Sequence, residues 1–380
     1  MGRKLGMEGD LDQDGALVLH VVATPRGRGA LQFARMLADR LDEPGVVRHR
    51  VLSVFHGEEE LEIDFYLGEP GGSHASEGFR PRVALRLRQE LARLNPAVVV
   101  AHGGDAMKYV APALFGTRRP LVYCVIGHYE GRREPLPLRE WAWRGLMARA
   151  AVVVAVSNEV FDECARRFGV VPPRLVTILN GRDASEFRPR SGPTPAEGPT
   201  LIFCGALTAQ KQPDRFVEVV RHLRSEGRSF RALLVGDGPL APTLATVAPN
   251  AGIELLGPRS DIAELLRRSD VFVFPSRPPE GLPGVLVEAG LSGLPIVSTD
   301  VPGATTVIRD GQTGMIVDDS VAALASAVGR LLDDPELRAA QGAAARRWCE
   351  SRFSLDVIAQ QWGDALRPLL GTRKMSRART

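Results

Sequence analysis

The chain has 380 residues and a formal net charge of +3, with 44% hydrophobic and 24% charged residues. This length allows two domains of ordinary size, and the hydrophobic content is sufficient for packed cores. The small net charge gives no electrostatic argument for a nucleic-acid partner. The sequence lacks a run of about 18 apolar residues, so we expect no transmembrane helix.

The termini and the cysteines indicate a reduced, cytoplasmic setting. Residues 1–14 are polar and lack the apolar segment of a signal peptide. We expect residues 1–14 and 371–380 to be disordered tails. Two Asp-x-Asp pairs within residues 10–14 precede every predicted strand, so we expect them to be solvated and we expect no metal site. Four cysteines without Cys-x-x-Cys spacing predict reduced thiols: Cys124, Cys164, Cys204 and Cys349.

In the first half, short apolar runs alternate with longer amphipathic segments. Strands are predicted at 17–23, 46–55, 97–101, 120–126 and 151–156, and helices at 29–41 and 81–94. This alternation is typical of βαβ units in a parallel sheet with helices on both faces. The Gly-x-Gly at Gly27 and Gly29 is not the full dinucleotide fingerprint, so NAD binding is only weakly supported.

Two histidines follow apolar strands of this half. His102 comes after the run 98–101, and His128 comes after the run 122–127. The carboxyl ends of parallel strands face the ligand crevice of such a sheet. Both histidines are therefore candidates for ligand contact, and an ordinary loop histidine is the alternative for each.

Residues 132–147 mix several arginines with Trp141 and Trp143. Interleaved basic and aromatic side chains suit a membrane surface or an acceptor. A helix packed against its own domain is the simpler interpretation, and we favour it. A peripheral contact with the inner face of the membrane remains the alternative.

The second half repeats the alternating pattern after a segment rich in Pro, Gly, Ser and Thr at 188–199, which predicts an interdomain linker. The predicted strands are 200–204, 232–235, 253–256, 271–274, 295–298 and 314–317. The predicted helices are 214–226, 240–247, 261–269, 284–292, 321–332 and 355–369. Two similar strand series predict two doubly wound domains with a ligand crevice between them.

Glu280 and Glu288 bracket the sequence GLPGVLV, with the first carboxylate in a Gly/Pro loop and the second within a predicted helix. Five helical residues from Gly284 to Glu288 span roughly 7 Å. An anion at the helix start would meet free N–H groups and the positive end of the helix dipole. A nucleotide-sugar has this layout, because a sugar and a ribose flank its diphosphate.

Several motifs of the second half occur in a characteristic order. They are VSN (156–158), LNGRD (179–183), CGALTAQK (204–211), LVGDGP (234–239), LGPRSD (256–261), SDVFVFPS (269–276) and EGLPGVLVE (280–288). From about residue 150 to 369 the chain resembles retaining glycosyltransferases of glycosyltransferase family four, also called glycosyl transferases group one. The resemblance implies the GT-B fold, in which two Rossmann-like domains face each other across a cleft.

The resemblance assigns roles to several side chains of the second half. Glu280 would contact hydroxyl groups of the donor sugar, and Glu288 would contact those of the ribose. Lys211 would face the diphosphate, with Gly205 in the same loop among the substrate-binding residues. Arg259 matches a loop that contacts the base.

The turn between the two glutamates would approach the diphosphate through its backbone. N–H groups from Leu282 onward would meet the phosphate oxygens. Gly281 and Gly284 lack Cβ atoms and permit this approach. Pro283 fits the first turn of a helix, where an amide hydrogen is not needed. Gly236 and Gly238 are expected to serve turn geometry.

The first half carries weaker parallels to the family. Residues 25–30 resemble its N-terminal Gly-rich loop, which would bring Gly29 close to the donor phosphate or sugar. A family histidine near the donor sugar makes His128 the favoured catalytic candidate, with His102 as runner-up. One departure concerns Ala206, which stands where the family often has an arginine that grips the diphosphate. Another arginine, such as Arg26 or Arg28, is expected to substitute.

These observations predict a retaining glycosyltransferase that uses a nucleotide diphosphate sugar and needs no metal or other cofactor. The acceptor would be a sugar, a lipid-linked molecule or a small molecule, and no nucleic acid is involved. The expected domains are 15–187 for the acceptor, with helix 353–370 crossing back onto it, and 200–352 for the donor. The alternatives are a non-catalytic nucleotide-sugar-binding subunit, a nucleotide-sugar epimerase and a nicotinamide dehydrogenase.

Overall fold

A computed structural model describes residues 15–23, 28–56, 63–69, 78–126, 137–192, 198–278, 280 and 282–371. The chain forms two compact units, one of Met1–Leu179 with Ile358–Thr380 and one of Asn180–Val357. We call them unit 1 and unit 2. The expected tail 1–14 and all but the first residue of the expected tail 371–380 lie outside the described residues, as do Arg26, Gly281 and His128.

Unit 1 is built on a parallel sheet of seven strands in the order β3-β2-β1-β4-β5-β6-β7. The strands are β1 (Ala16–Val22), β2 (Val47–Phe55), β3 (Phe65–Glu69), β4 (Val98–His102), β5 (Leu121–Val125), β6 (Val152–Ala155) and β7 (Leu175–Thr177). All residues of β4 and β5 are buried. Helices on both faces explain why these strands are continuous apolar runs.

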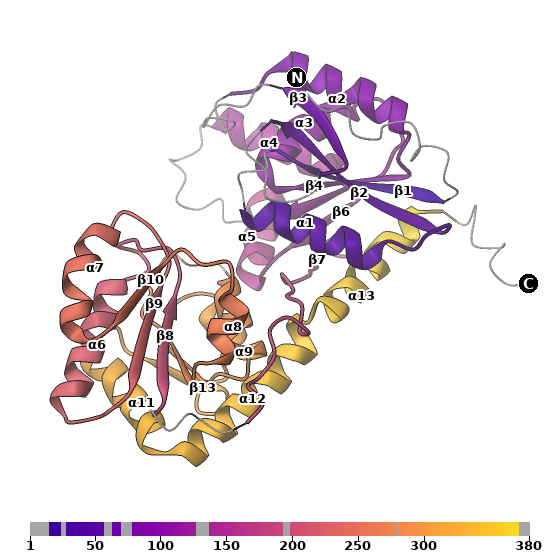
Figure 1. Ribbon diagram of the computed structural model, residues 1–380. Coiled ribbons are helices and arrows are strands. Elements are labelled where there is room, and N and C mark those ends of the chain that lie inside the picture. The colour runs from indigo at the N-terminus through magenta and orange to yellow at the C-terminus, as the bar shows by residue number, and fades with distance from the viewer. Residues whose placement is uncertain are drawn as a thin grey trace, which may run out of the picture. The chain divides into compact units, whose positions relative to one another are not determined.

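The helices of unit 1 are α1 (Arg28–Leu41), α2 (Pro81–Leu94), α3 (Gly103–Ala113), α4 (Pro137–Arg149) and α5 (Asn158–Phe168). Helix α1 covers one face of the sheet, while α2 and α3 cover the other (Figure 1). The last helix, α13 (Leu355–Leu366), belongs to unit 1 from Ile358 onward. Its Trp362 is fully buried and lies against Phe33 and His102.

Unit 2 contains a parallel sheet of six strands in the order β10-β9-β8-β11-β12-β13. The strands are β8 (Thr200–Cys204), β9 (Arg231–Val235), β10 (Glu254–Gly257), β11 (Val271–Phe274), β12 (Ile296–Thr299) and β13 (Gly314–Val317). The helices are α6 (Pro213–Ser225), α7 (Ala241–Val247), α8 (Ile262–Arg267), α9 (Gly284–Leu291), α10 (Ala304–Val307), α11 (Val321–Asp333) and α12 (Pro335–Phe353). Helices α6 and α11 share one face, and α8, α9 and α12 lie on the other (Figure 1).

The α/β class and the two doubly wound parallel sheets are confirmed. Strands β8, β11 and β13 and helix α2 have the predicted bounds. The predictions omitted β3, β7, α3, α5, α10 and α12. Helix α12 is the longest of these, and its alanines and arginines give little contrast between a buried and an exposed face. The segment predicted as a linker is anchored at Arg190, whose Nη1 lies 2.9 Å from Asp270 Oδ1.

Candidate functional site

The candidate site lies at the carboxyl ends of β8 and β11 in unit 2. These strands are neighbours, but the chain leaves β8 through α6 toward β9 on the other side. The strand order therefore reverses between them, which is where doubly wound sheets bind ligands. The loop after β8 contributes Lys211, and the loop after β11 contributes Glu280.

Lys211 and Glu280 form the first charge pair of the site. Lys211 Nζ lies 2.6 Å from Glu280 Oε1 and 4.9 Å from the ring centroid of Phe274, the last residue of β11. The carboxylate is only 7% exposed, so a cation beside it is needed to offset the cost of its burial. The contact satisfies the distance of an ion pair but not the angles of a hydrogen bond. Two groups that the sequence placed in separate motifs are thus brought together.

Glu288 and Arg182 form the second charge pair. Arg182 Nε lies 2.6 Å from Glu288 Oε1, and both side chains are largely buried, at 18% and 17% exposed. Arg182 Nη1 also donates to the carbonyl oxygen of Gly181 at 3.0 Å. The sequence motif contained Arg182, but no role was assigned to it. The signal that could have found it was an arginine directly after the Asn-Gly turn.

Further carboxyl and thiol groups surround Glu288. Burial raises the pKa of the Cys204 thiol to about 12, and the nearby Glu288 carboxylate adds to this shift. Burial also raises the pKa of Glu186, with Asp183 and Glu288 adding to the shift and Arg182 opposing it. Cys204 is the last residue of β8. The Glu288 carboxylate thus acts electrostatically on Cys204, at the carboxyl end of that strand, and on Glu186.

Helix α9 begins beside both charge pairs. Pro283 is its N-cap residue, and no side chain caps the helix or places an acid in its first turn. The N–H of Leu286 donates to the carbonyl oxygen of Pro283 at 3.1 Å. The N–H groups of Gly284 and Val285, at the very start of the helix, have no carbonyl partner one turn earlier within it. Leu282 is partly exposed. The predicted role of this turn in binding a diphosphate remains a prediction.

The backbone structure explains why two glycines follow β9, beside the loop that carries Lys211. Gly236 and Gly238 have φ angles of +139° and +156°, which side chains rarely adopt. A Cβ atom on Gly236 would collide with the carbonyl oxygen of Gly205, and one on Gly238 would lie 2.7 Å from that of Leu207. The prediction that these two glycines serve turn geometry is confirmed. Gly205 itself is partly exposed at the end of β8.

Arg259 lies in the loop after β10 and forms a bidentate pair with Asp261. Its Nε and Nη2 atoms lie 2.8 and 2.7 Å from the two carboxylate oxygens. Both side chains are more than two-fifths exposed. Contact with a base stays a prediction for Arg259.

In unit 1, His102 lies in a buried row of three histidines. His20 Nδ1 lies 2.9 Å from His102 Nε2, and His20 Nε2 lies 3.0 Å from His49 Nδ1. The His102 ring is 2% exposed and stacks against Trp362. Contact between His102 and a ligand stays a prediction. It would require the Trp362 side chain to move away from the His102 ring. Gly29 lies in the first turn of α1.

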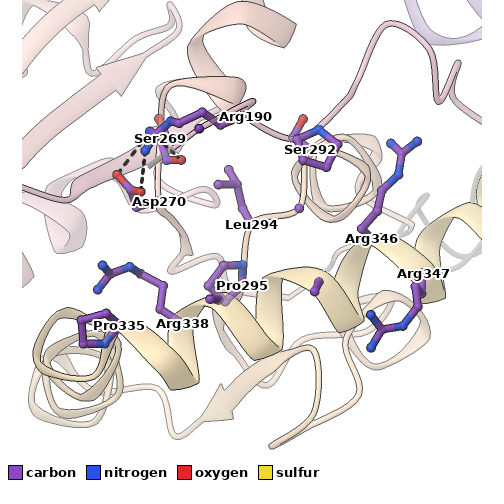
Figure 2. A pocket seen from close by; sticks show the side chains of 15 residues that line it. Arg190, Ser269, Asp270, Ser292, Leu294, Pro295, Pro335, Arg338, Arg346 and Arg347 are labelled. Atoms are coloured by element: carbon purple, nitrogen blue, oxygen red, sulfur yellow. Dashed lines mark hydrogen bonds and ion pairs between the residues drawn. The ribbon is translucent and has the colours of Figure 1, made fainter. Parts of the chain in front are cut away.

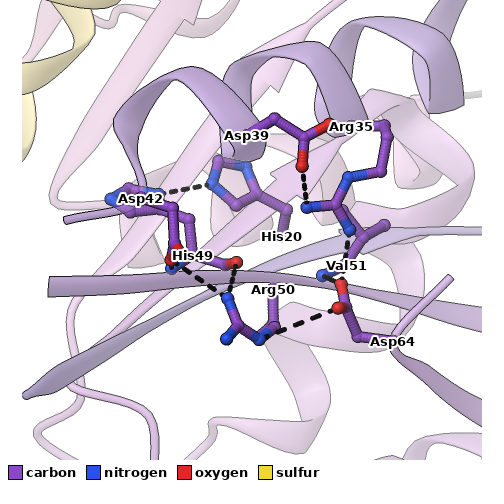
Figure 3. Close-up of polar contacts among 8 residues, drawn as sticks. All are labelled: His20, Arg35, Asp39, Asp42, His49, Arg50, Val51 and Asp64. Atoms are coloured by element: carbon purple, nitrogen blue, oxygen red, sulfur yellow. Dashed lines mark hydrogen bonds and ion pairs between the residues drawn. The ribbon is translucent and has the colours of Figure 1, made fainter. Parts of the chain in front are cut away.

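Burial keeps the histidine row neutral at pH 7. Burial lowers the pKa of His102 to about 3 and that of His49 to about 4. For His49, the Asp42 carboxylate opposes this lowering of the pKa and the Arg50 guanidinium adds to it. The pKa of His20 falls well below its usual value through burial and through His102, His49 and Arg35. Arg35 and Arg50 are themselves paired with Asp64, beside the histidines (Figure 3).

Helix α4 packs against its own unit, as favoured from the sequence. Trp143 stacks on Tyr123 with ring centroids 6.5 Å apart, and Met147 is fully buried. Trp141 is 74% exposed. A contact of this side chain with a membrane or an acceptor stays a prediction.

A separate cavity of about 520 Å³ lies in unit 2, beside the residues that precede β11 and β12 (Figure 2). Arginines line it, including Arg190 and Arg346. Arg190 pairs with Asp270, and Arg346 donates to backbone carbonyls and to Glu350. None of the predicted site residues that the structure describes lines this cavity, which borders the amino ends of β11 and β12.

Metal-ligand clusters and membrane-spanning helices are both absent from the described residues. No group of three or more His, Cys, Asp or Glu residues has the arrangement of a metal site in the described part of the chain. No helix within that part has the length and apolar character needed to cross a membrane.

Comparisons with known proteins agree with this geometry. Residues 27–186 match the profile of Glycosyltransferase Family 4, and residues 198–334 match that of Glycosyl transferases group 1. The chain is similar in structure to Anabaena Alr3699/HepE solved with UDP and glucose, with a TM-score of 0.75 and 19% identity. That similarity covers 93% of this chain and 100% of the other. The fold is therefore that of GT-B glycosyltransferases.

Two curated relatives are similar to this chain in sequence. The chain is 31% identical over 324 residues to the GDP-mannose-dependent alpha-(1-6)-phosphatidylinositol monomannoside mannosyltransferase of Mycolicibacterium smegmatis, covering 78% of this chain and 82% of that protein. It is 30% identical over 278 residues to the exopolysaccharide phosphotransferase SCO2592 of Streptomyces coelicolor. This second match covers 71% of this chain but only 29% of that protein. The chain belongs to glycosyltransferase family 4, the glycosyl transferases group 1.

Proposed function

We propose that this glycosyltransferase moves a sugar from a nucleotide diphosphate sugar to a hydroxyl acceptor, with retention of the anomeric configuration. The observation that carries the proposal is the convergence of the Lys211–Glu280 and Arg182–Glu288 pairs at the carboxyl ends of β8 and β11. This arrangement offers carboxylates for two hydroxyl-bearing rings and positive charge for the diphosphate between them.

Each group has a proposed task in donor binding. Glu280 accepts hydrogen bonds from hydroxyls of the donor sugar, and Glu288 accepts them from the ribose. Lys211 and the N–H groups at the start of α9 stabilise the diphosphate. Arg259 lies beside the base. Gly29 and His128, with His102 as the alternative histidine, contact the donor from unit 1.

In the proposed reaction, the bond between the anomeric carbon and the terminal phosphate oxygen breaks. The acceptor oxygen forms its bond on the face that the leaving group vacates, and its proton passes to the departing phosphate oxygen. The enzyme positions the two substrates and stabilises the negative charge that develops on the diphosphate. Lys211 and the helix dipole supply the positive charge, so we propose that no metal is required.

The relatives suggest which donors to test first. The M. smegmatis relative is named for GDP-mannose and a phosphatidylinositol mannoside, and Alr3699/HepE was solved with UDP and glucose. We propose a sugar, a lipid-linked molecule or a small molecule as acceptor. Exposed Trp141 is compatible with a lipid-linked acceptor at the inner membrane face.

The decisive experiment is a thermal-shift panel of UDP-, GDP-, ADP- and dTDP-sugars. A ligand at about 100 times its Kd stabilises the folded state by about 2.7 kcal/mol, which raises Tm by several degrees. A shift with one donor, followed by release of the nucleoside diphosphate when an acceptor is added, would support the proposal. No shift with any donor would contradict it.

A second candidate, a nucleotide-sugar-binding subunit without catalysis, is favoured by Ala206. This residue is exposed in the loop after β8 and brings no charge to it. Such a subunit would show the thermal shift but neither sugar transfer nor slow hydrolysis of the donor.

A further inference from the structure

Arg182 is held at a defined place by its backbone. Its N–H donates to the carbonyl oxygen of Phe353 at 2.9 Å, and its own carbonyl oxygen accepts from the N–H of Leu355 at 2.8 Å. These bonds join the turn around Arg182 to the end of α12. The side chain therefore starts from a fixed point rather than from a free loop.

The guanidinium lies against the start of α9. A Cβ atom on Gly284, the first residue of that helix, would collide with Arg182 Nη2. Glu288 is four residues further along, so it projects from the same face of the helix. The guanidinium thus extends from the helix start, where Nη2 lies, to the Glu288 carboxylate, which is bound by Nε. Arg182 gives a reason for Gly284 besides the phosphate approach predicted from the sequence.

A guanidinium at the start of a helix needs a nearby anion, and Glu288 supplies one for Arg182. The start of a helix carries partial positive charge, and the first turn of α9 holds no acid to balance it. Glu288 compensates one charge through Nε, but Nη2 donates to no partner among the described residues. Lys211 is already paired with Glu280, and Ala206 brings no charge. The helix start therefore offers N–H donors that no described acceptor uses, from Nη2 of Arg182 and from the first residues of α9.

We propose that Arg182 is a substrate-positioning residue that binds the diphosphate of the donor through Nη2 and orients Glu288 through Nε. Oε1 of Glu288 is engaged by Arg182, which leaves Oε2 for the ribose hydroxyls. One guanidinium thereby sets the distance between the diphosphate and the ribose. This inference rests on the proposed function, because it concerns the same donor site.

The test uses UDP and GDP together with UMP and GMP as probes, since the donor sugar is not needed. Binding constants are measured by calorimetry for the wild type, Arg182→Gln and Arg182→Lys. Arg228→Gln is the matched control: Arg228 Nη2 lies 2.8 Å from Asp333 Oδ2, and the residue precedes the amino end of β9. Far-ultraviolet circular dichroism and Tm show whether each variant is folded.

Of UDP and GDP, we consider the one that the wild type binds more tightly. We expect Arg182→Gln to lower the affinity for this diphosphate by about tenfold to a hundredfold, as for removal of a hydrogen bond to a charged group. The corresponding monophosphate should lose clearly less affinity, because it has no terminal phosphate for Nη2 to bind. Arg182→Lys should recover part of the diphosphate affinity by retaining the charge, and Arg228→Gln should bind like the wild type.

Equal losses for diphosphate and monophosphate would overturn the inference, because they would mean that Arg182 acts only through Glu288. Unchanged diphosphate affinity in a folded Arg182→Gln variant would overturn it as well, while leaving the proposed function intact. If the wild type bound neither UDP nor GDP, ADP and dTDP with their monophosphates would replace them as probes. Binding of none of the four diphosphates would overturn the proposed function and this inference together.

If Arg182→Gln were unfolded, the binding constants of Arg182→Lys would test the inference in its place. A selective weakening of diphosphate binding by Arg182→Lys would support the inference, because an ammonium group cannot reach the diphosphate and Glu288 together as a guanidinium does. Wild-type affinity of Arg182→Lys for both the diphosphate and the monophosphate would overturn the inference.

Discussion

The two units share one architecture but place their polar groups at different depths. In unit 1, three histidines lie in a row inside the sheet layer, and Trp362 of the last helix packs over one of them. In unit 2, charged pairs lie at the carboxyl ends of the central strands, with side chains between 7% and 20% exposed. The same fold therefore uses buried polar groups for packing in one unit and keeps charged groups accessible in the other.

The difference follows from where each residue lies in its element. His20 and His49 are inside strands, so their rings point into covered faces of the sheet. Lys211 and Glu280 are in loops that follow strands, and Glu288 is near the start of a helix. We therefore expect changes in the histidine row to alter stability, and changes in the charge pairs to alter ligand binding.

The largest effect is expected for Trp362→Ala. Removal of this fully buried ring leaves a cavity beside Phe33 and His102 and should lower the free energy of unfolding by about 3–5 kcal/mol. Urea denaturation measures the loss. Trp141→Ala is the control, because that side chain is 74% exposed and should cost little. Similar losses in the two variants would argue against the packing role of α13.

Next in size are Lys211→Gln and Glu280→Gln. Lys211→Gln should reduce kcat for sugar transfer by about a hundredfold to a thousandfold, the range seen when a group that stabilises developing charge is removed. Glu280→Gln should also reduce kcat, because it removes the carboxylate that holds Lys211 and that we propose contacts the donor sugar. Release of the nucleoside diphosphate measures the rate once the donor is known. Lys108→Gln is a matched control, since Lys108 pairs with Asp105 at 2.8 Å in unit 1. If both site variants kept wild-type activity, the Lys211–Glu280 pair would have no role in the reaction.

A smaller effect is expected for Glu288→Ala, which should weaken donor binding about tenfold to a hundredfold by removing an acceptor for the ribose and leaving Arg182 unpaired. Calorimetry with the donor found in the thermal-shift panel measures Kd. Glu218→Ala, at an exposed position of α6, should leave Kd unchanged. An unchanged Kd for Glu288→Ala would exclude the proposed ribose contact.

The smallest effect concerns pH. Because burial lowers the pKa of His49 to about 4, the unfolded chain takes up its proton first as the pH falls below about 6.5. Stability from this group is fully present above that pH and is lost toward pH 4. His49→Gln should therefore make the free energy of unfolding less dependent on pH between 6 and 5, by up to about 1.4 kcal/mol per pH unit.

Exposed His222 supplies the control for the pH experiment. Its side chain is 46% exposed on α6, so His222→Gln should leave the slope of stability against pH close to that of the wild type. Equal slopes for His49→Gln and the wild type would show that the histidine row does not stay neutral on folding.

Local sequence predicted the elements best where the apolar pattern was strong. Strand β8 and helix α2 were found at their bounds, because an uninterrupted apolar run and a clear amphipathic period leave one interpretation. Helix α12 was not predicted, since its burial depends on packing against α9 and α11 that no local pattern encodes. The histidine row could not be predicted from local sequence either, because His20, His49 and His102 come from three different strands.

The sequence by itself determined the α/β class, the two strand series and the motif that carries Glu280 and Glu288, because strand runs, turn residues and motifs are local properties of the chain. Only the tertiary structure decided which charges meet. Arg182 and Glu288 are 106 positions apart, and their pairing depends on how the end of α12 fixes one and the start of α9 presents the other. Such pairing arises when elements far apart in the chain pack together, and spacing along the chain does not specify it.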